Sequence, residues 1–216
     1  MAKKKVVTKT SKTPKKTSIT LVVDRSGSMM TVQSDAEGGI NQFIDEQKKA
    51  PGDAVLTLVQ FDTEYEAVCT VEPIEKVKKY ELKPRGMTAL LDAVGKAINE
   101  TDEAIKKMPK KKRPDLIVVA IVTDGHENAS MEFKKDQIKS LIEAREKDGW
   151  QFSFIGADAD AFDEASSMGI SGLRTAQYNP LKKAGAAYAV LSRSVTSVRS
   201  YGGQMVYTDV DRKDME

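Results

Sequence analysis

The sequence predicts an α/β domain in which a mostly parallel sheet of about six strands is doubly wound, with helices on both faces. Short apolar or β-branched runs alternate along the chain with longer segments whose apolar residues recur at helical spacing. Such alternation is typical of right-handed crossovers between parallel strands. At 216 residues, the chain is long enough for one domain of this kind with a short tail at either end.

The first half of the domain opens with the β-branched run Ile19–Val23, which we interpret as a buried strand. A helix follows, because Ser34 and Glu37 have capping-box spacing and the next apolar residues share one helical face. Ala54–Phe61 is predicted as the second strand. Glu66–Val71 follows it after a tight loop and is therefore predicted as a short antiparallel edge strand.

In the second half, Thr88 precedes a long amphipathic helix. Leu116–Val122 is the most apolar run in the chain and suits a central strand that is covered on both faces. A further helix leads to the strand Trp150–Ile155. The remaining predicted elements are a short helix at 158–168, an edge strand at 173–176, and a final helix that begins at Asn179-Pro180 and ends at Gly202-Gly203.

These elements place the domain at residues 18–200, between a basic tail at 1–17 and a C-terminal tail at 201–216. The basic tail carries seven lysines and no acidic residue, and it has too few apolar residues to fold, so we expect it to be disordered. A second basic run, Lys106–Arg113, holds six positive charges in eight residues. Weak nucleic-acid contact through residues 3–16 and 106–113 is one interpretation, and a solvated tail and loop are the other.

Composition narrows the class of protein. Hydrophobic residues make up 40% of the chain and charged residues 31%, as in soluble globular proteins. No stretch approaches the roughly 18 apolar residues of a membrane span, and the N-terminus has no apolar signal segment. A single cysteine, Cys69, excludes an internal disulfide framework and a cysteine-based zinc cluster. We therefore expect a cytoplasmic protein that does not bind a membrane.

Polar residues gather where two predicted strands and one loop end. The first strand runs into Asp24-Arg25-Ser26-Gly27-Ser28, and the central strand runs into Thr123-Asp124-Gly125. Between them, Thr88 stands at the start of a helix. The carboxyl ends of neighbouring parallel strands face one crevice, so we expect two carboxylates and three hydroxyls to meet there.

This set of side chains favours a hard divalent cation. Asp24, Ser26, Ser28, Thr88 and Asp124 offer only oxygen donors, which suit Mg²⁺, or Mn²⁺ or Ca²⁺, better than zinc. Two aspartates at close range would repel each other without a cation between them. Neutral hydroxyl ligands leave residual positive charge on the ion, which would still attract a carboxylate.

The three segments resemble the von Willebrand factor A domain, also called the integrin I-type domain. Asp24-Arg25-Ser26-Gly27-Ser28 matches its D-x-S-x-S signature, Thr88 is similar to its second-loop threonine, and Asp124 to its third-loop aspartate. The resemblance covers residues 18–200 and implies a Rossmann-like fold with a metal-ion-dependent adhesion site. It further implies that the metal coordinates an Asp or Glu of a partner protein, that no reaction is catalysed, and that the chain acts as a subunit or adaptor in an intracellular complex.

Each residue of this set also has a purely structural interpretation. Thr88 alone could be a helix N-cap, Ser26 and Ser28 could be turn residues, and Asp24 could begin an Asx-turn. We expect Arg25 either to steer an acidic partner or to point into solvent.

His126, the only histidine, is interpreted either as a partner-binding residue at the rim or as a plain solvent-exposed loop residue. An alternative function, a phosphatase-like enzyme with Asp24 as nucleophile, lacks a second aspartate two residues later, because Ser26 stands there.

Overall fold

The computed structural model describes residues 13, 15–157 and 160–215 of the chain. Its strands are β1 (Lys16–Asp24), β2 (Asp53–Phe61), β3 (Tyr65–Pro73), β4 (Leu116–Thr123), β5 (Gln151–Gly156) and β6 (Thr175–Gln177). Its α-helices are α1 (Gln33–Lys49), α2 (Leu90–Lys107), α3 (Lys135–Lys147), α4 (Ala161–Ser167), α5 (Pro180–Tyr201) and α6 (Asp209–Met215). Short 3₁₀ turns occur at Gly27–Thr31, Ile74–Lys76, Lys110–Lys112 and Gly172–Arg174.

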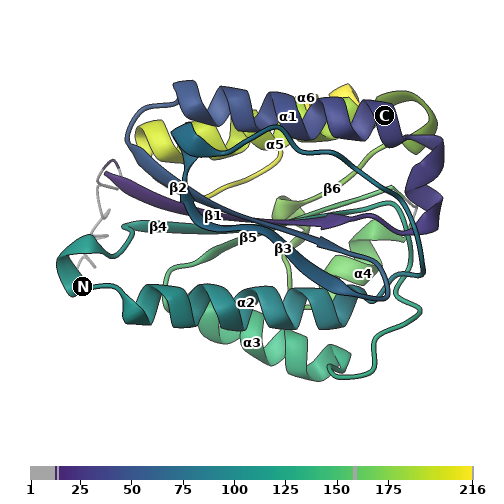
Figure 1. Ribbon diagram of the computed structural model, residues 1–216, viewed down its shortest axis with the longest axis horizontal. Helices are drawn as coiled ribbons and strands as arrows, with labels where there is room; N and C mark the ends of the chain where they lie inside the picture. The colour runs from purple at the N-terminus through teal and green to yellow at the C-terminus, as the bar shows by residue number, and fades with distance from the viewer. Residues whose placement is uncertain (1–12, 14, 158–159, 216) are drawn as a thin grey trace, which may run out of the picture.

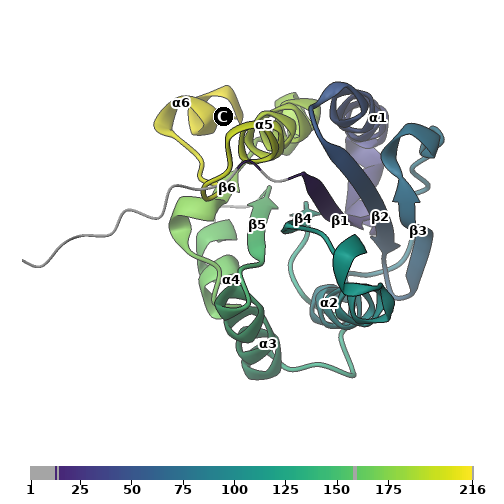
Figure 2. The same cartoon turned by 90° about the vertical axis from the view of Figure 1, so that its left-hand side faces the viewer.

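The six strands form one sheet in the order β3-β2-β1-β4-β5-β6, which confirms the predicted doubly wound sheet of about six strands. All neighbouring pairs are parallel except β2 and β3, so the predicted antiparallel edge strand is confirmed. Helices α1, α5 and α6 cover one face of the sheet, and α2, α3 and α4 cover the other (Figure 1, Figure 2). Among the described residues, no helix combines the length and apolarity that crossing a membrane requires.

The core consists of two apolar layers separated by the sheet. Val118 and Val122 of β4 pack in the layer under α1 and α5, whereas Val119 and Ile121 pack in the layer under α2 and α3. Successive side chains of a strand point to opposite faces, so a strand covered on both sides needs an unbroken apolar run. This explains why the central strand is the most apolar segment in the sequence.

Helix α1 begins earlier than predicted, and helix α4 begins later. Helix α1 begins at Gln33 after a 3₁₀ turn, and its N-cap is Val32 rather than Ser34. The predicted capping box does not form, because Glu37 Oε2 accepts a hydrogen bond of 2.9 Å from the backbone N–H of Leu82. Helix α4 begins at Ala161 with Asp160 as its N-cap, and the predicted cap, Asp158, lies outside the described residues.

The boundaries of the domain also differ from the prediction. Lys16 and Thr17, which we assigned to the basic tail, begin β1, and the Asp115 carboxylate accepts hydrogen bonds of 3.1 Å from the backbone N–H groups of Lys15 and Lys16. Residues 1–12 and 14 of that tail lie outside the described residues.

The predicted C-terminal tail is packed onto the domain. Met205, Tyr207 and Met215 are almost completely buried in the layer that contains α1 and α5. The Gln151 side chain fixes this segment, since it donates to the carbonyl of Gly203 at 2.7 Å and accepts from the N–H of Met205 at 2.6 Å. The sequence did not predict this packing, because these apolar residues are too widely spaced to form a stripe at helical or strand periodicity.

Candidate functional site

The candidate site lies where β1 and β4 end side by side. These strands are parallel neighbours, and Asp24 and Thr123 are their last residues. The Thr123 hydroxyl donates a hydrogen bond of 2.5 Å to Asp24 Oδ2, and the backbone N–H of Ser26 donates one of 2.7 Å to Asp24 Oδ1. Asp24 is fully buried, so the end of β1 holds a carboxylate beneath the surface of the crevice.

The site is built from three loops: the first follows β1, the second precedes α2 and the third follows β4. A chain of side-chain oxygens runs from the first loop to the third. Ser26 Oγ lies 2.9 Å from Ser28 Oγ, and the Ser28 hydroxyl donates a hydrogen bond of 2.7 Å to Asp124 Oδ1. Ser26 is buried whereas Ser28 is exposed, so the chain of oxygens rises from the buried carboxylate to the surface.

Gly125 shows how close the second loop comes to the other two. A Cβ added to Gly125 would lie 2.9 Å from Thr88 Oγ1, 3.5 Å from Ser28 Oγ and 3.7 Å from Asp24 Oδ2. Oxygens from the first and second loops therefore surround one small space that only glycine leaves open. Asn128 holds the second loop against the third, because its side-chain oxygen accepts from the Thr88 N–H at 2.9 Å and its N–H donates to the Thr88 carbonyl at 3.0 Å.

The structure thus brings together all five predicted metal-ligating residues. Thr88 is not the N-cap of α2, and the Ser26 and Ser28 hydroxyls bond each other and Asp124 rather than their own backbone. Helix α2 has Ala89 as its N-cap, and neither Ala89 nor Ser26 makes a side-chain capping bond. Asp24 does make the Asx-type bond to Ser26, but only through Oδ1.

The electrostatics of the site centre on Asp24. Burial raises the pKa of this carboxyl, and it prevails over the hydrogen bonds from Thr123 and Ser26, which act in the opposite direction. The donors around it are carboxylate and hydroxyl oxygens. The described part of the chain contains no group of three or more His, Cys, Asp or Glu side chains placed for a metal. A donor set of carboxylate and hydroxyl oxygens fits Mg²⁺, Mn²⁺ or Ca²⁺.

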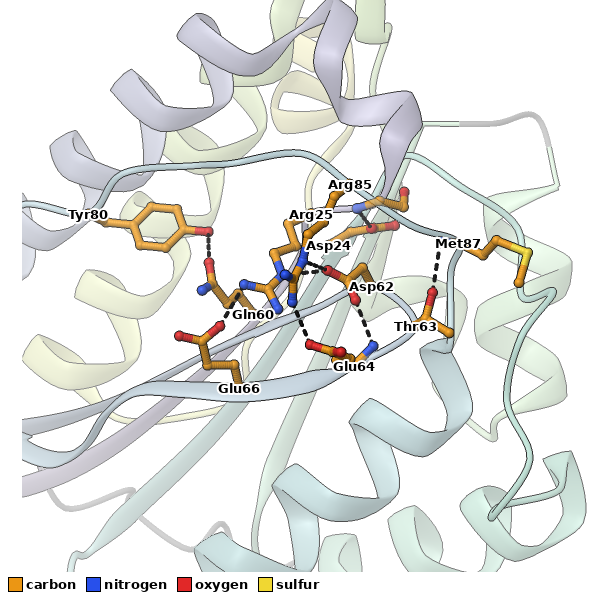
Figure 3. Close-up of polar contacts among 11 residues, drawn as sticks. Asp24, Arg25, Gln60, Asp62, Thr63, Glu64, Glu66, Tyr80, Arg85 and Met87 are labelled. Atoms are coloured by element: carbon orange, nitrogen blue, oxygen red, sulfur yellow. Dashed lines mark hydrogen bonds and ion pairs between the residues drawn. The ribbon is translucent and has the colours of Figure 1, made fainter.

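The side chain of Arg25 does not lie where the sequence predicts it. Instead of steering a partner or pointing into solvent, its side chain is buried and turned toward the end of β2 (Figure 3). Its Nε donates to Asp62 Oδ2 at 2.8 Å and its Nη1 donates to Glu66 Oε2 at 2.7 Å. The direction follows from the backbone, because the Arg25 N–H bonds the Phe61 carbonyl at 2.8 Å. His126 is exposed and follows Asp124 by two residues.

The basic run Lys106–Arg113 is far from this crevice. It covers the end of α2 and the 3₁₀ turn that precede β4, at the amino-terminal edge of the sheet, whereas the candidate site lies at the carboxyl edge. Most of the run is exposed, with Lys106 paired to Asp102 at 2.7 Å and Lys107 to Glu103 at 3.6 Å. Any ligand of the run would therefore occupy a separate surface.

Four contributors to the site were given no role from the sequence: Thr123 and Gly125, which flank Asp124, and Asp62 and Arg85. Thr123 and Asp62 had a detectable signal, because each stands at or directly after the carboxyl end of a predicted strand, as Asp24 and Asp124 do. Gly125 and Arg85 gave no such signal, since their importance depends on contacts with other loops.

Solved structures of von Willebrand factor type A domains share this fold. The chain is similar to proximal thread matrix protein 1 from the mussel byssus, with a TM-score of 0.62, 16% identity, and 86% of this chain and 47% of that chain covered. It is also similar to the domain of the type V pili tip protein Mfa5 from Porphyromonas gingivalis, with a TM-score of 0.61, 11% identity, and 91% and 99% covered. A third similar structure is manganese-loaded TRAP from Plasmodium vivax, with a TM-score of 0.53, 13% identity, and 80% and 71% covered.

These likenesses establish that the chain has the fold of a von Willebrand factor type A domain. The chain spans about half the length of the mussel protein. No protein-family model matches the sequence, and no curated protein matches it.

Proposed function

We propose that the chain is a divalent-cation-dependent protein-binding module with a metal-ion-dependent adhesion site. In this proposal Asp24, Ser26, Ser28, Thr88 and Asp124 hold Mg²⁺, or Mn²⁺ or Ca²⁺. When bound, the cation supplies positive charge that neutral hydroxyl ligands do not cancel, and this charge attracts an Asp or Glu of a partner protein. The observation that carries the proposal is the convergence of oxygens from the loops around Gly125.

The similar structures support the proposal without deciding it. TRAP, one of the similar structures, is manganese-loaded, and Mfa5, another, is a pilus tip protein. Metal binding and attachment to another molecule are thus compatible with this fold. We further propose a role as a subunit or adaptor in an intracellular complex, which the resemblance to the von Willebrand factor A domain implies, and the single cysteine fits a reducing compartment.

We infer that the chain does not act as a phosphatase-like enzyme. A nucleophilic aspartate must present a free oxygen to its substrate. Asp24 is fully buried and both of its oxygens accept hydrogen bonds, at 2.5 Å and 2.7 Å. Such an enzyme would also need a second aspartate two residues later, where this chain has Ser26. Magnesium-dependent hydrolysis of an aryl phosphate that disappears in Asp24→Asn would contradict this inference.

Affinity capture of partners tests the proposed function. The chain is immobilised, exposed to an extract of the cells that produce it, and washed in buffer with magnesium or with a chelator. We expect a protein that is retained only with magnesium and only by the unmodified chain, not by Asp124→Ala. Asp163→Ala is the matched control, since Asp163 is an exposed aspartate of α4. The same proteins retained under all conditions would refute metal-mediated binding.

A further inference from the structure

The loop that carries Thr88 is attached to the end of β2 at both of its ends. At one end, Arg85 Nε donates a hydrogen bond of 2.8 Å to Asp62 Oδ2, the oxygen that also accepts from Arg25 Nε. At the other end, the Ala89 N–H donates to the Asp62 carbonyl at 2.9 Å. Thr88 lies between these two anchor points, so Asp62 spans the segment that carries it.

The same carboxylate also fixes the loop that carries the serines. Arg25 follows Asp24 and precedes Ser26, and its guanidinium is buried against Asp62. The two loops also bond each other directly, through the Arg85 N–H and Arg25 carbonyl at 2.8 Å and the Gly27 N–H and Gly86 carbonyl at 3.1 Å. The buried Asp62 side chain therefore holds both loops through hydrogen bonds to Arg25 and Arg85.

Asp62 is well held itself. It is 2% exposed, and its other oxygen, Oδ1, accepts a hydrogen bond of 2.6 Å from the backbone N–H of Glu64. A buried carboxylate with two guanidinium partners and a backbone donor has little freedom to move.

We propose that Asp62 is a positioning residue, which sets where Thr88 lies relative to Ser26 and Ser28 and thereby tunes the cation affinity of the site. This inference rests on the proposed function. Asp62 acts through Arg25 and Arg85 and is not itself a ligand. Residues that orient metal ligands in this way commonly change metal affinity by about 10- to 100-fold when they are altered.

Arg85→Gln is the decisive variant. Its side chain is 54% exposed, so the change removes the side-chain link from Asp62 to the second loop, together with the exposed ion pair to Glu64, and leaves Arg25 and Asp62 paired. Substitution of Asp62 would instead leave the buried Arg25 without its partner and destabilise the fold. Loss of a positive charge near a cation site should by itself tighten cation binding. If Asp62 positions Thr88 through Arg85, the variant should instead bind the cation about tenfold more weakly.

The experiment is a titration of the full chain with Mn²⁺, followed by the electron paramagnetic resonance signal of the free ion. Lys83→Gln is the matched control, because it removes an exposed positive charge from the same loop and does not touch Asp62. We expect weaker binding for Arg85→Gln and unchanged or slightly tighter binding for Lys83→Gln. Unchanged or tighter binding by Arg85→Gln would overturn the inference.

A second comparison separates positioning from a general loosening of the site. In a Thr88→Ala background, Arg85→Gln should have little further effect, because the residue that it positions is already gone. An equal loss of affinity in both backgrounds would overturn the inference. If the unmodified chain binds no Mn²⁺, the proposed function fails as well. If Thr88→Ala weakens binding while Arg85→Gln does not, only the role of Asp62 fails.

Discussion

The Thr123 hydroxyl donates a hydrogen bond of 2.5 Å to Asp24 Oδ2, so the last residue of β4 holds the carboxylate that ends β1. The same hydroxyl lies 3.0 Å from the Gly125 carbonyl and 3.1 Å from the Gly125 N–H. Thr123 therefore joins the first and third loops of the candidate site at the points where they leave β1 and β4. It is almost completely buried, so water cannot replace these bonds.

Thr123→Val tests this junction, because valine keeps the shape of threonine and removes the hydroxyl. The buried Asp24 oxygen loses a donor, which should lower the free energy of unfolding by about 1–3 kcal/mol. Urea denaturation measures the change. Thr70→Val, at an exposed position of β3, is the control and should alter the stability by less than about 0.5 kcal/mol. Equal stabilities for the two variants would contradict the role of Thr123.

Gly125→Ala tests whether the space among the site oxygens is used. The new methyl group would lie 2.9 Å from Thr88 Oγ1, and relieving such a contact costs about 1–3 kcal/mol. We expect Mn²⁺ affinity to fall about tenfold or more, measured by isothermal titration calorimetry. Unchanged affinity would mean that the cation does not occupy this space.

Gly38→Ala is the control for that substitution. Apart from its own stretch of helix, no described atom lies within 4 Å of the Cβ position of Gly38, which sits on the exposed side of α1. Alanine in a helix interior is favoured over glycine by about 0.5–1 kcal/mol, so this variant should be slightly more stable and should bind Mn²⁺ as the unmodified chain does.

Met215→Ala tests the packed C-terminal segment. Met215 is fully buried, so its truncation should leave a cavity and lower the free energy of unfolding by about 2–5 kcal/mol. Val210→Ala in the same helix, where the side chain is 68% exposed, should change the stability by less than about 0.5 kcal/mol. Thermal and urea unfolding measure both variants. Equal effects would show that α6 does not pack on the domain in solution.

Asp211 should make the stability depend on pH in the acidic range. Burial acts to raise its pKa, but hydrogen bonds from Thr208 and the Arg193 guanidinium outweigh it, so the pKa is lowered. Its contribution is complete above the ordinary aspartate pKa of about 4 and is lost as the pH falls through the lowered value.

In Asp211→Asn, the decline of stability below about pH 4 should therefore be shallower than in the unmodified chain. Urea unfolding at a series of pH values measures the two slopes. Parallel slopes would contradict the assignment of this pKa shift to the folded state.

Much of the fold was predictable, because the strands have unambiguous local signals. Leu116–Val122 has the unbroken apolar run of a strand covered on both faces, and it forms β4 between β1 and β5. The proximity of the five oxygen-bearing residues was predictable for a related reason. Each stands at or just after a strand end or at a helix start, and parallel strands bring such positions to one edge.

The remaining features depend on contacts between distant segments, which local patterns do not encode. Glu37 bonds the backbone of Leu82 instead of capping its own helix, and Arg25 turns toward Asp62 instead of toward solvent. Leu173 belongs to a 3₁₀ turn and is 64% exposed, although it was predicted in an edge strand, which begins only at Thr175. In each case the alternative was locally plausible and a tertiary contact decided the outcome.

A titration of the unmodified chain and of Thr88→Ala with Mn²⁺ tests the proposed metal site most directly. Thr88 is almost completely buried, and its backbone is held by Asn128, so removal of the hydroxyl should not displace the loop. We predict one Mn²⁺ per chain, competed by Mg²⁺, with affinity that falls about tenfold or more in Thr88→Ala and not in Thr70→Ala. The absence of Mn²⁺ binding, or equal affinity in all three proteins, would contradict a metal site formed by these loops.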